Sequence, residues 1–137
     1  MCKTIKQKVR FDAPSESVYR LLTDSKAHSA FTGRPAKISR NVGGAFSVYS
    51  GSITGINVDL APGKRVVQAW RAKDFPVGIF SMATFNLTPT PSGGTELVLT
   101  HRGVPKDLIP RIEKAWREAY WSKMKQYLSR KSKLPSK

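Results

Sequence analysis

Residues 106–129 read KDLIPRIEKAWREAYWSKMKQYLS, and this segment is the most informative one for the architecture. At about 100° per residue, a helix over these positions gathers large apolar side chains on one side. These residues are Ile109, Ile112, Trp116, Tyr120, Met124 and Tyr127. The polar residues Arg111, Lys114, Glu118 and Lys125 lie on the opposite side. The spacing predicts one continuous amphipathic helix over residues 105–128 that buries Trp116 and Tyr120 against a sheet and leaves Arg111 and Lys114 exposed.

The chain before this helix predicts strands separated by turns. Residues 5–11 alternate, with Ile5, Gln7, Val9 and Phe11 on one face and cations on the other, as in a half-buried edge strand. Two short helical segments follow, one starting at Pro14–Ser15 and one running toward Phe31. Further strands are expected at residues 36–40, 45–50, 53–60, 65–72, 79–88 and 95–102. Gly and Pro residues in the short connections favour an antiparallel meander.

The order of these elements predicts an α+β fold. A curved antiparallel sheet wrapped around the single long C-terminal helix would cover the apolar face of the sheet. The 137 residues fit one domain, which we expect to span residues 1–128. Residues 129–137, SRKSKLPSK, have almost nothing to bury and are expected to form a basic flexible tail.

The composition is strongly basic. Twenty-four Lys and Arg against nine Asp and Glu give a net charge of +15, which suits an acidic protein, nucleic acid or an anionic membrane as partner. The charges are scattered along the chain, which favours a solubilising surface over a dedicated groove. No apolar run approaches the roughly 20 residues that span a bilayer, and the first residues lack a signal-peptide core. We therefore expect no membrane insertion and a cytoplasmic location.

The sequence shows no recognisable catalytic constellation. His28 and His101 have no ligand residues at metal-site spacing, and Glu113 and Glu118 do not face each other on a helix. Gly43–Gly44 lacks the Lys–Ser/Thr of a phosphate loop. These patterns predict no catalytic residue, no metal and no cofactor, so the chain is not expected to be an enzyme.

Two groups of residues are candidates for binding. Trp70, Phe85, Leu97 and Leu99 on the strands point toward Trp116 and Tyr120 of the helix, and they form either plain core or the lining of an apolar-ligand cavity. Plain core is the favoured interpretation, because large aromatic side chains fill space.

Trp121 leaves the apolar stripe and projects between Arg117 and Lys125. It is either a partner contact or a side chain that another loop of the chain covers. Both interpretations remain open.

Several motifs resemble a known family. They are AFTGRPAKISRNVGGAFSVYSGSITG at 30–55, DLAPGKRVVQAWRAKDFPVGIFSMATFNL at 59–87, GTELVLTHRGVP at 94–105 and WREAYWSKMKQYL at 116–128. In this order they are similar to the C-terminal domain of the activator of heat-shock protein 90 ATPase. The resemblance implies the helix-grip fold of the START and pollen-allergen superfamily. It also implies that Trp70, Phe80, Trp116 and Tyr120 are fold-defining.

The resemblance implies a non-enzymatic co-chaperone-like module that binds heat-shock protein 90 and stimulates its ATPase, or only binds it. The family's N-terminal domain has no counterpart in these motifs, so activation without it is an open question. A carrier of lipids or other hydrophobic ligands is the alternative function. Nucleic-acid binding is least favoured, because no strand pair interleaves aromatic residues with Lys and Arg.

Overall fold

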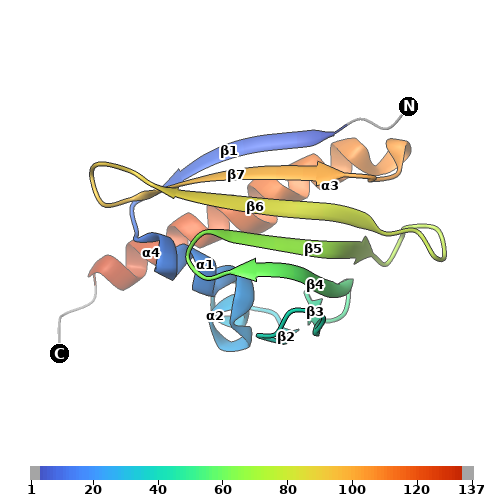
Figure 1. Cartoon of the computed structure of the whole chain (residues 1–137), viewed down its shortest axis with the longest axis horizontal. Helices are drawn as coiled ribbons and strands as arrows, with labels where there is room; N and C mark the ends of the chain where they lie inside the picture. The colour runs from blue at the N-terminus through green and yellow to red at the C-terminus, as the bar shows by residue number, and fades with distance from the viewer. Residues whose placement is uncertain (1–3, 134–137) are drawn as a thin grey trace.

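A computed structural model of the chain describes residues 4–133, with side chains described as far as Arg130. It contains one seven-stranded antiparallel sheet and a long C-terminal helix, which confirms the expected α+β, helix-grip architecture (Figure 1). The strands are β1 (Ile5–Phe11), β2 (Lys37–Ile38), β3 (Ala45–Val48), β4 (Ile53–Ala61), β5 (Arg65–Ala72), β6 (Ser81–Pro89) and β7 (Thr95–Arg102). The turn residues therefore separate strands largely where the sequence predicts them.

The strands follow the order β1-β7-β6-β5-β4-β3-β2 across the sheet. Six of them form a meander from β2 to β7, and β1 closes the sheet by pairing antiparallel with β7, from Ile5 opposite His101 to Phe11 opposite Thr95. Figure 1 shows the long helix behind the sheet, with the opposite face open toward the viewer. The cations of β1 thus lie along one edge of the sheet, as the alternation predicts.

The helical segments depart from one uninterrupted α-helix. They are α1 (Ser15–Thr23), α2 (Ser25–Thr32), the 3-10 turn η1 (Lys106–Leu108), α3 (Ile109–Ala115), the π-helical turn η2 (Trp116–Trp121) and α4 (Ser122–Lys133). The expected helix over 105–128 therefore has a 3-10 start and a π-helical middle, and it continues to Lys133. The first part of the expected tail is helical, while residues 134–137 lie outside the described residues.

One hydrophobic core lies between the sheet and the helices. Trp116 and Tyr120 are buried in it, and Arg111 and Lys114 are exposed, as the helical spacing predicts. The sheet curves around this core with the help of a β-bulge in β4, between Asn57 and Asp59. The bulge lets neighbouring strands bend while their inward-facing residues stay buried.

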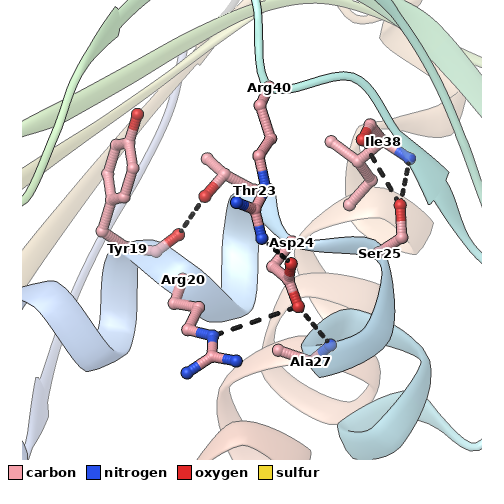
Figure 2. Close-up of polar contacts among 8 residues, drawn as sticks. All are labelled: Tyr19, Arg20, Thr23, Asp24, Ser25, Ala27, Ile38 and Arg40. Carbon is pink, nitrogen blue, oxygen red and sulfur yellow. Dashed lines mark hydrogen bonds and ion pairs between the residues drawn. The ribbon is translucent and has the colours of Figure 1, made fainter.

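A polar cluster at the α1–α2 junction ties these helices to β2 (Figure 2). Asp24 caps α2, since its carboxylate accepts a hydrogen bond from the Ala27 backbone N–H at 2.9 Å. It also forms an ion pair with Arg40 at 2.5 Å, and that hydrogen bond is the main reason that the pKa of Asp24 is lowered. Ser25 Oγ donates to the Ile38 carbonyl and accepts from the Ile38 N–H. The Ser25 hydroxyl therefore takes the place of a neighbouring strand at the edge of β2.

Candidate functional site

A pocket of about 290 Å³ lies between the long helix and the β3–β4–β5 end of the sheet. Its inner wall is aromatic and includes Trp70, Trp116 and Tyr120. Ala115 and Ala119 of the helix face the same space, and their small side chains leave it open. Its volume is just below the range of roughly 300–1,000 Å³ that is usual for small-molecule sites.

The aromatic wall is rigid because its rings pack on one another. The Trp70 and Trp116 ring centroids are 5.5 Å apart, and those of Trp116 and Tyr120 are 4.6 Å apart. The His101 ring packs edge-on against Trp70 at 4.8 Å. Such packing restricts the movement of the rings that form the wall.

His101 joins this wall through a buried chain of hydrogen bonds. The Trp116 indole N–H donates to His101 Nδ1 at 3.1 Å, so the His101 proton lies on Nε2 and faces Ser81 Oγ at 2.7 Å. The Ser81 hydroxyl in turn donates to the Trp70 carbonyl at 3.0 Å. Only a neutral imidazole satisfies this chain. Burial lowers the pKa of His101 to about 3, which keeps the ring neutral.

The mouth of the pocket is cationic. Exposed Arg34, Lys73 and Arg111 surround it, and the carboxylate at the mouth, Asp74, is paired with Arg111 at 2.5 Å. A mouth with an excess of cations above an apolar interior suits an amphipathic anion, such as a carboxylate with an apolar tail.

A strained hairpin forms the other wall of the pocket. Tyr49 and Ser50 have φ angles of +51° and +57°, a left-handed conformation that is unusual for residues other than Gly. The Tyr49 hydroxyl donates to the Ala119 carbonyl in η2, and burial raises the pKa of Tyr49 to about 12. This hydrogen bond offsets part of the strain and connects the hairpin to the helix.

The candidate cavity residues separate into two groups. Trp70, Trp116 and Tyr120 line the 290 Å³ pocket. Phe85 lines a separate void of about 10 Å³ beside His28, and Leu97 and Leu99 are fully buried in the core. Phe85 on β6 and Leu97 and Leu99 on β7 thus lie in the core, away from the 290 Å³ pocket.

The expected projection of Trp121 between Arg117 and Lys125 is wrong, and of its two open interpretations the structure supports the one in which the chain itself covers the side chain. Trp121 is only 6% exposed, and its indole N–H donates to the Gln7 side-chain oxygen at 2.7 Å. Its ring stacks on Trp116 with a centroid distance of 5.5 Å and an interplanar angle of 16°. Arg117 and Lys125 are exposed, but Trp121 does not lie between them as a surface contact.

The π-helical turn is the physical reason for the error. In a π-helix the hydrogen bonds run from residue i to i+5, so residues five apart lie above one another. Trp116 and Trp121 are five apart, whereas the 100° spacing of an α-helix turns Trp121 away from the apolar stripe. One turn of different pitch therefore moves Trp121 into the core, where β1 covers it.

The environments of Phe80, His28 and His101 also depend on contacts that the sequence pattern does not reveal. Phe80, expected to define the fold, is 52% exposed in the β5–β6 loop. Both histidines are buried, His28 in α2 and His101 near the end of β7. The alternation of β7 contains a signal for His101, since it falls on the same face as Leu97 and Leu99.

No group of three or more His, Cys, Asp or Glu side chains within residues 4–130 is arranged to hold a metal ion. None of the helices in the described part of the chain is long and apolar enough to cross a membrane.

Comparisons with known proteins identify the family. Residues 12–129 match the model of the family described as activator of Hsp90 ATPase homolog 1-like protein. The human activator of 90 kDa heat shock protein ATPase homolog 1 is 34% identical over 125 residues, which cover 91% of this chain and 36% of the human protein. A Dictyostelium discoideum homolog is 32% identical over 134 residues, covering 96% of this chain and 34% of its own length. The chain thus spans about a third of the length of these curated relatives.

Solved structures show the same fold. A crystal structure of an HSP90 activator from Plasmodium falciparum superposes with a TM-score of 0.87 at 22% identity and covers 92% of this chain and 96% of that one. CalU16 from Micromonospora echinospora gives a TM-score of 0.79 at 21% identity, covering 93% of this chain and 74% of that one. At these identities the structures support the architecture alone. The family match covers most of the chain, which therefore belongs to the activator of Hsp90 ATPase homolog 1-like family.

Proposed function

We propose that this chain is a co-chaperone module that binds Hsp90 and modulates its ATPase activity without catalysing a reaction itself. The family match over residues 12–129 is the observation that carries the proposal. The named relatives are activators of the 90 kDa heat shock protein ATPase, and this chain corresponds to about a third of their length. Binding is therefore the first property to test, and stimulation the second.

The charge of the chain supports an acidic partner. Its net charge of +15 produces long-range attraction to an acidic surface, which accelerates encounter and weakens as salt screens it. We expect the affinity for Hsp90 to fall at least tenfold when ionic strength rises from about 0.05 M to about 0.3 M. An affinity independent of salt would remove the basic surface from the explanation.

The experiment measures binding and ATP hydrolysis in parallel. The chain is titrated into Hsp90 by calorimetry, and the steady-state ATPase rate is recorded over the same concentrations. A reaction with ATP and the chain alone controls for hydrolysis by the chain itself. A rise in rate that saturates with binding supports activation, and saturable binding without a rise supports binding alone. No binding at low ionic strength would refute the proposal.

The pocket supports a second candidate function, the binding of an amphipathic anion. The aromatic wall and the cationic mouth are the observations that favour it. Decanoate, titrated by calorimetry, is a suitable probe because it joins a carboxylate to an apolar tail. Ala115→Phe would fill the pocket from the helix, and Arg34→Gln would remove a cation from its mouth. Loss of decanoate binding in both variants supports the candidate, whereas unchanged binding contradicts it.

A further inference from the structure

The β5–β6 loop presents apolar side chains to solvent. Val77 is 96% exposed and Phe80 is 52% exposed, and Ile79 between them is also exposed. Single exposed apolar residues are common on protein surfaces, but neighbouring ones on one loop are a feature of interaction sites.

The loop is held rigidly, so this exposure is built into the fold. The Arg71 guanidinium donates to the carbonyls of Phe75, Pro76 and Ile79 at 2.9, 2.6 and 3.1 Å. Phe75 is buried and packs on Trp70 with a centroid distance of 5.9 Å. One guanidinium thus fixes the loop from within while Phe75 anchors it to the core. A loop fixed in this way loses little conformational entropy on binding.

The exposed residues continue onto the outer face of the sheet, the face without helices. Met82 on β6 and Ile56 on β4 are opposite the two sides of Ala69 on β5, in one cross-strand row. Both are more than 40% exposed, with Met82 two residues beyond Phe80. We call these residues the outer apolar patch: Ile56, Val58, Val77, Ile79, Phe80 and Met82.

Cations dominate the rest of this face. Among the strand residues that the structure describes, the outward positions carry seven cations and two carboxylates. The cations are Lys6, Lys8, Arg10, Lys37, Arg65, Arg71 and Arg102, and the carboxylates are Asp59 and Glu96. Both carboxylates are already paired, Asp59 with Arg65 and Glu96 with Arg10. The face thus has an apolar area at β4–β6 and a positive edge at β1.

We propose that the outer face of the sheet is the docking surface for an acidic protein partner whose contact area contains apolar groups. The outer apolar patch supplies the desolvated centre, and Lys6 and Lys8 supply attraction at the edge. This inference rests on the proposed function, in which the partner is Hsp90, and it names the face that Hsp90 contacts.

A protein fits this face better than a lipid bilayer does. Insertion of the β5–β6 loop alone into a bilayer would use Val77 but leave out Ile56 and Met82, which lie along the strands themselves. A partner must therefore lie along the sheet to cover them together with the loop. Binding to an anionic membrane is the competing result, and the vesicle measurement below detects it.

The test compares variants of the full chain in Hsp90 binding at low ionic strength. Val77→Ser with Phe80→Ser removes apolar contact without changing the net charge. We expect it to weaken binding at least tenfold, as loss of a central aromatic residue does. Because both side chains are exposed, the urea midpoint should remain that of the wild type.

A charge-matched pair tests the position of the cations. Lys6→Gln with Lys8→Gln removes two charges from the outer face, and Arg117→Gln with Lys125→Gln removes two from the exposed side of the helix. If the partner docks on the outer face, the first pair weakens binding severalfold more than the second. Equal losses would mean that only the net charge matters, and a larger loss for the second pair would place the partner on the helix. Either result overturns the proposal.

The wild-type measurement separates this inference from the proposed function. If the wild type binds and the Val77→Ser, Phe80→Ser variant binds equally well, the docking surface is wrong while the proposed function survives. If the wild type does not bind Hsp90, both fail. Vesicles of phosphatidylcholine with phosphatidylserine form the last arm. Tight binding to them that needs Val77 and Phe80, without binding to Hsp90, would identify a membrane surface instead and overturn the proposal.

Discussion

Acidification should destabilise this protein well above the pH at which its carboxylates titrate. His101 and His28 are buried and neutral, and burial lowers their pKa values to about 3 and about 4 from an ordinary value of 6.5. In the unfolded chain both rings take up protons as the pH falls through 6.5, whereas the folded rings do not. The unfolded state therefore binds more protons than the folded state. As a result, the free energy of unfolding decreases as the pH is lowered.

The size of this loss of stability follows from the difference between the histidine pKa values in the folded and unfolded states. At about 1.4 kcal/mol per pH unit, a drop from about pH 7.5 to about pH 5 costs each histidine about 2 kcal/mol, or about 4 kcal/mol together. That is a large share of the roughly 5–15 kcal/mol typical of a domain. The lowered pKa of Asp24 affects stability only below its ordinary value of 3.8, so this pH range isolates the histidines.

The assay is urea unfolding at several pH values, followed by tryptophan fluorescence. His101→Gln supplies the control, because an amide accepts from Trp116 and donates toward Ser81 but does not titrate. We expect the variant to be less stable at neutral pH and to lose only about half as much stability on acidification as the wild type. A wild type whose stability does not change over this range would refute the reasoning. So would a variant that keeps the full pH dependence.

Three substitutions test other parts of the fold by urea or thermal unfolding. Trp121→Ala should cost about 3–5 kcal/mol, since the ring is buried against Trp116, and a near-neutral effect would contradict the π-helical placement. Asp24→Ala should cost about 1–2 kcal/mol through loss of the α2 cap, while Asp24→Asn, which keeps a capping oxygen, should cost less; equal costs would argue against the cap. Gly55→Ala should cost about 3 kcal/mol or more, because the new Cβ would lie 1.9 Å from the Ala69 carbonyl oxygen, and a stable variant would contradict this close approach.

The architecture could be predicted because its signals are local and periodic. Alternation over β1, β5 and β7 fixes which side chains face the core, and Gly and Pro mark where each strand ends. The aromatic stripe of the long helix requires a sheet to cover it. Each of these patterns depends only on residues close together in sequence, which is why strand bounds and helix positions agree well with the structure.

The errors arise where distant contacts override local periodicity. The environment of Trp121 depends on Gln7, 114 residues earlier, and on a change of helical pitch that the residue pattern does not mark. His101 is buried because Ser81 and Trp116, from two other elements, satisfy both of its ring nitrogens. Phe80 is exposed because Arg71 and Phe75 already hold the loop, so the fold does not need its ring in the core.

The π-helical turn also bears on where the 290 Å³ pocket lies beside the long helix. It directs Trp121 toward β1, where its ring packs edge-on against Phe11 with 6.4 Å between the ring centroids. On the other side the helix presents Ala115 and Ala119, which leave the space opposite Tyr49 open. A regular α-helix would not stack Trp121 on Trp116. The same turn therefore closes the core under β1 and leaves the pocket under β3 and β4, so that partner docking and ligand binding can be tested on separate faces of one domain.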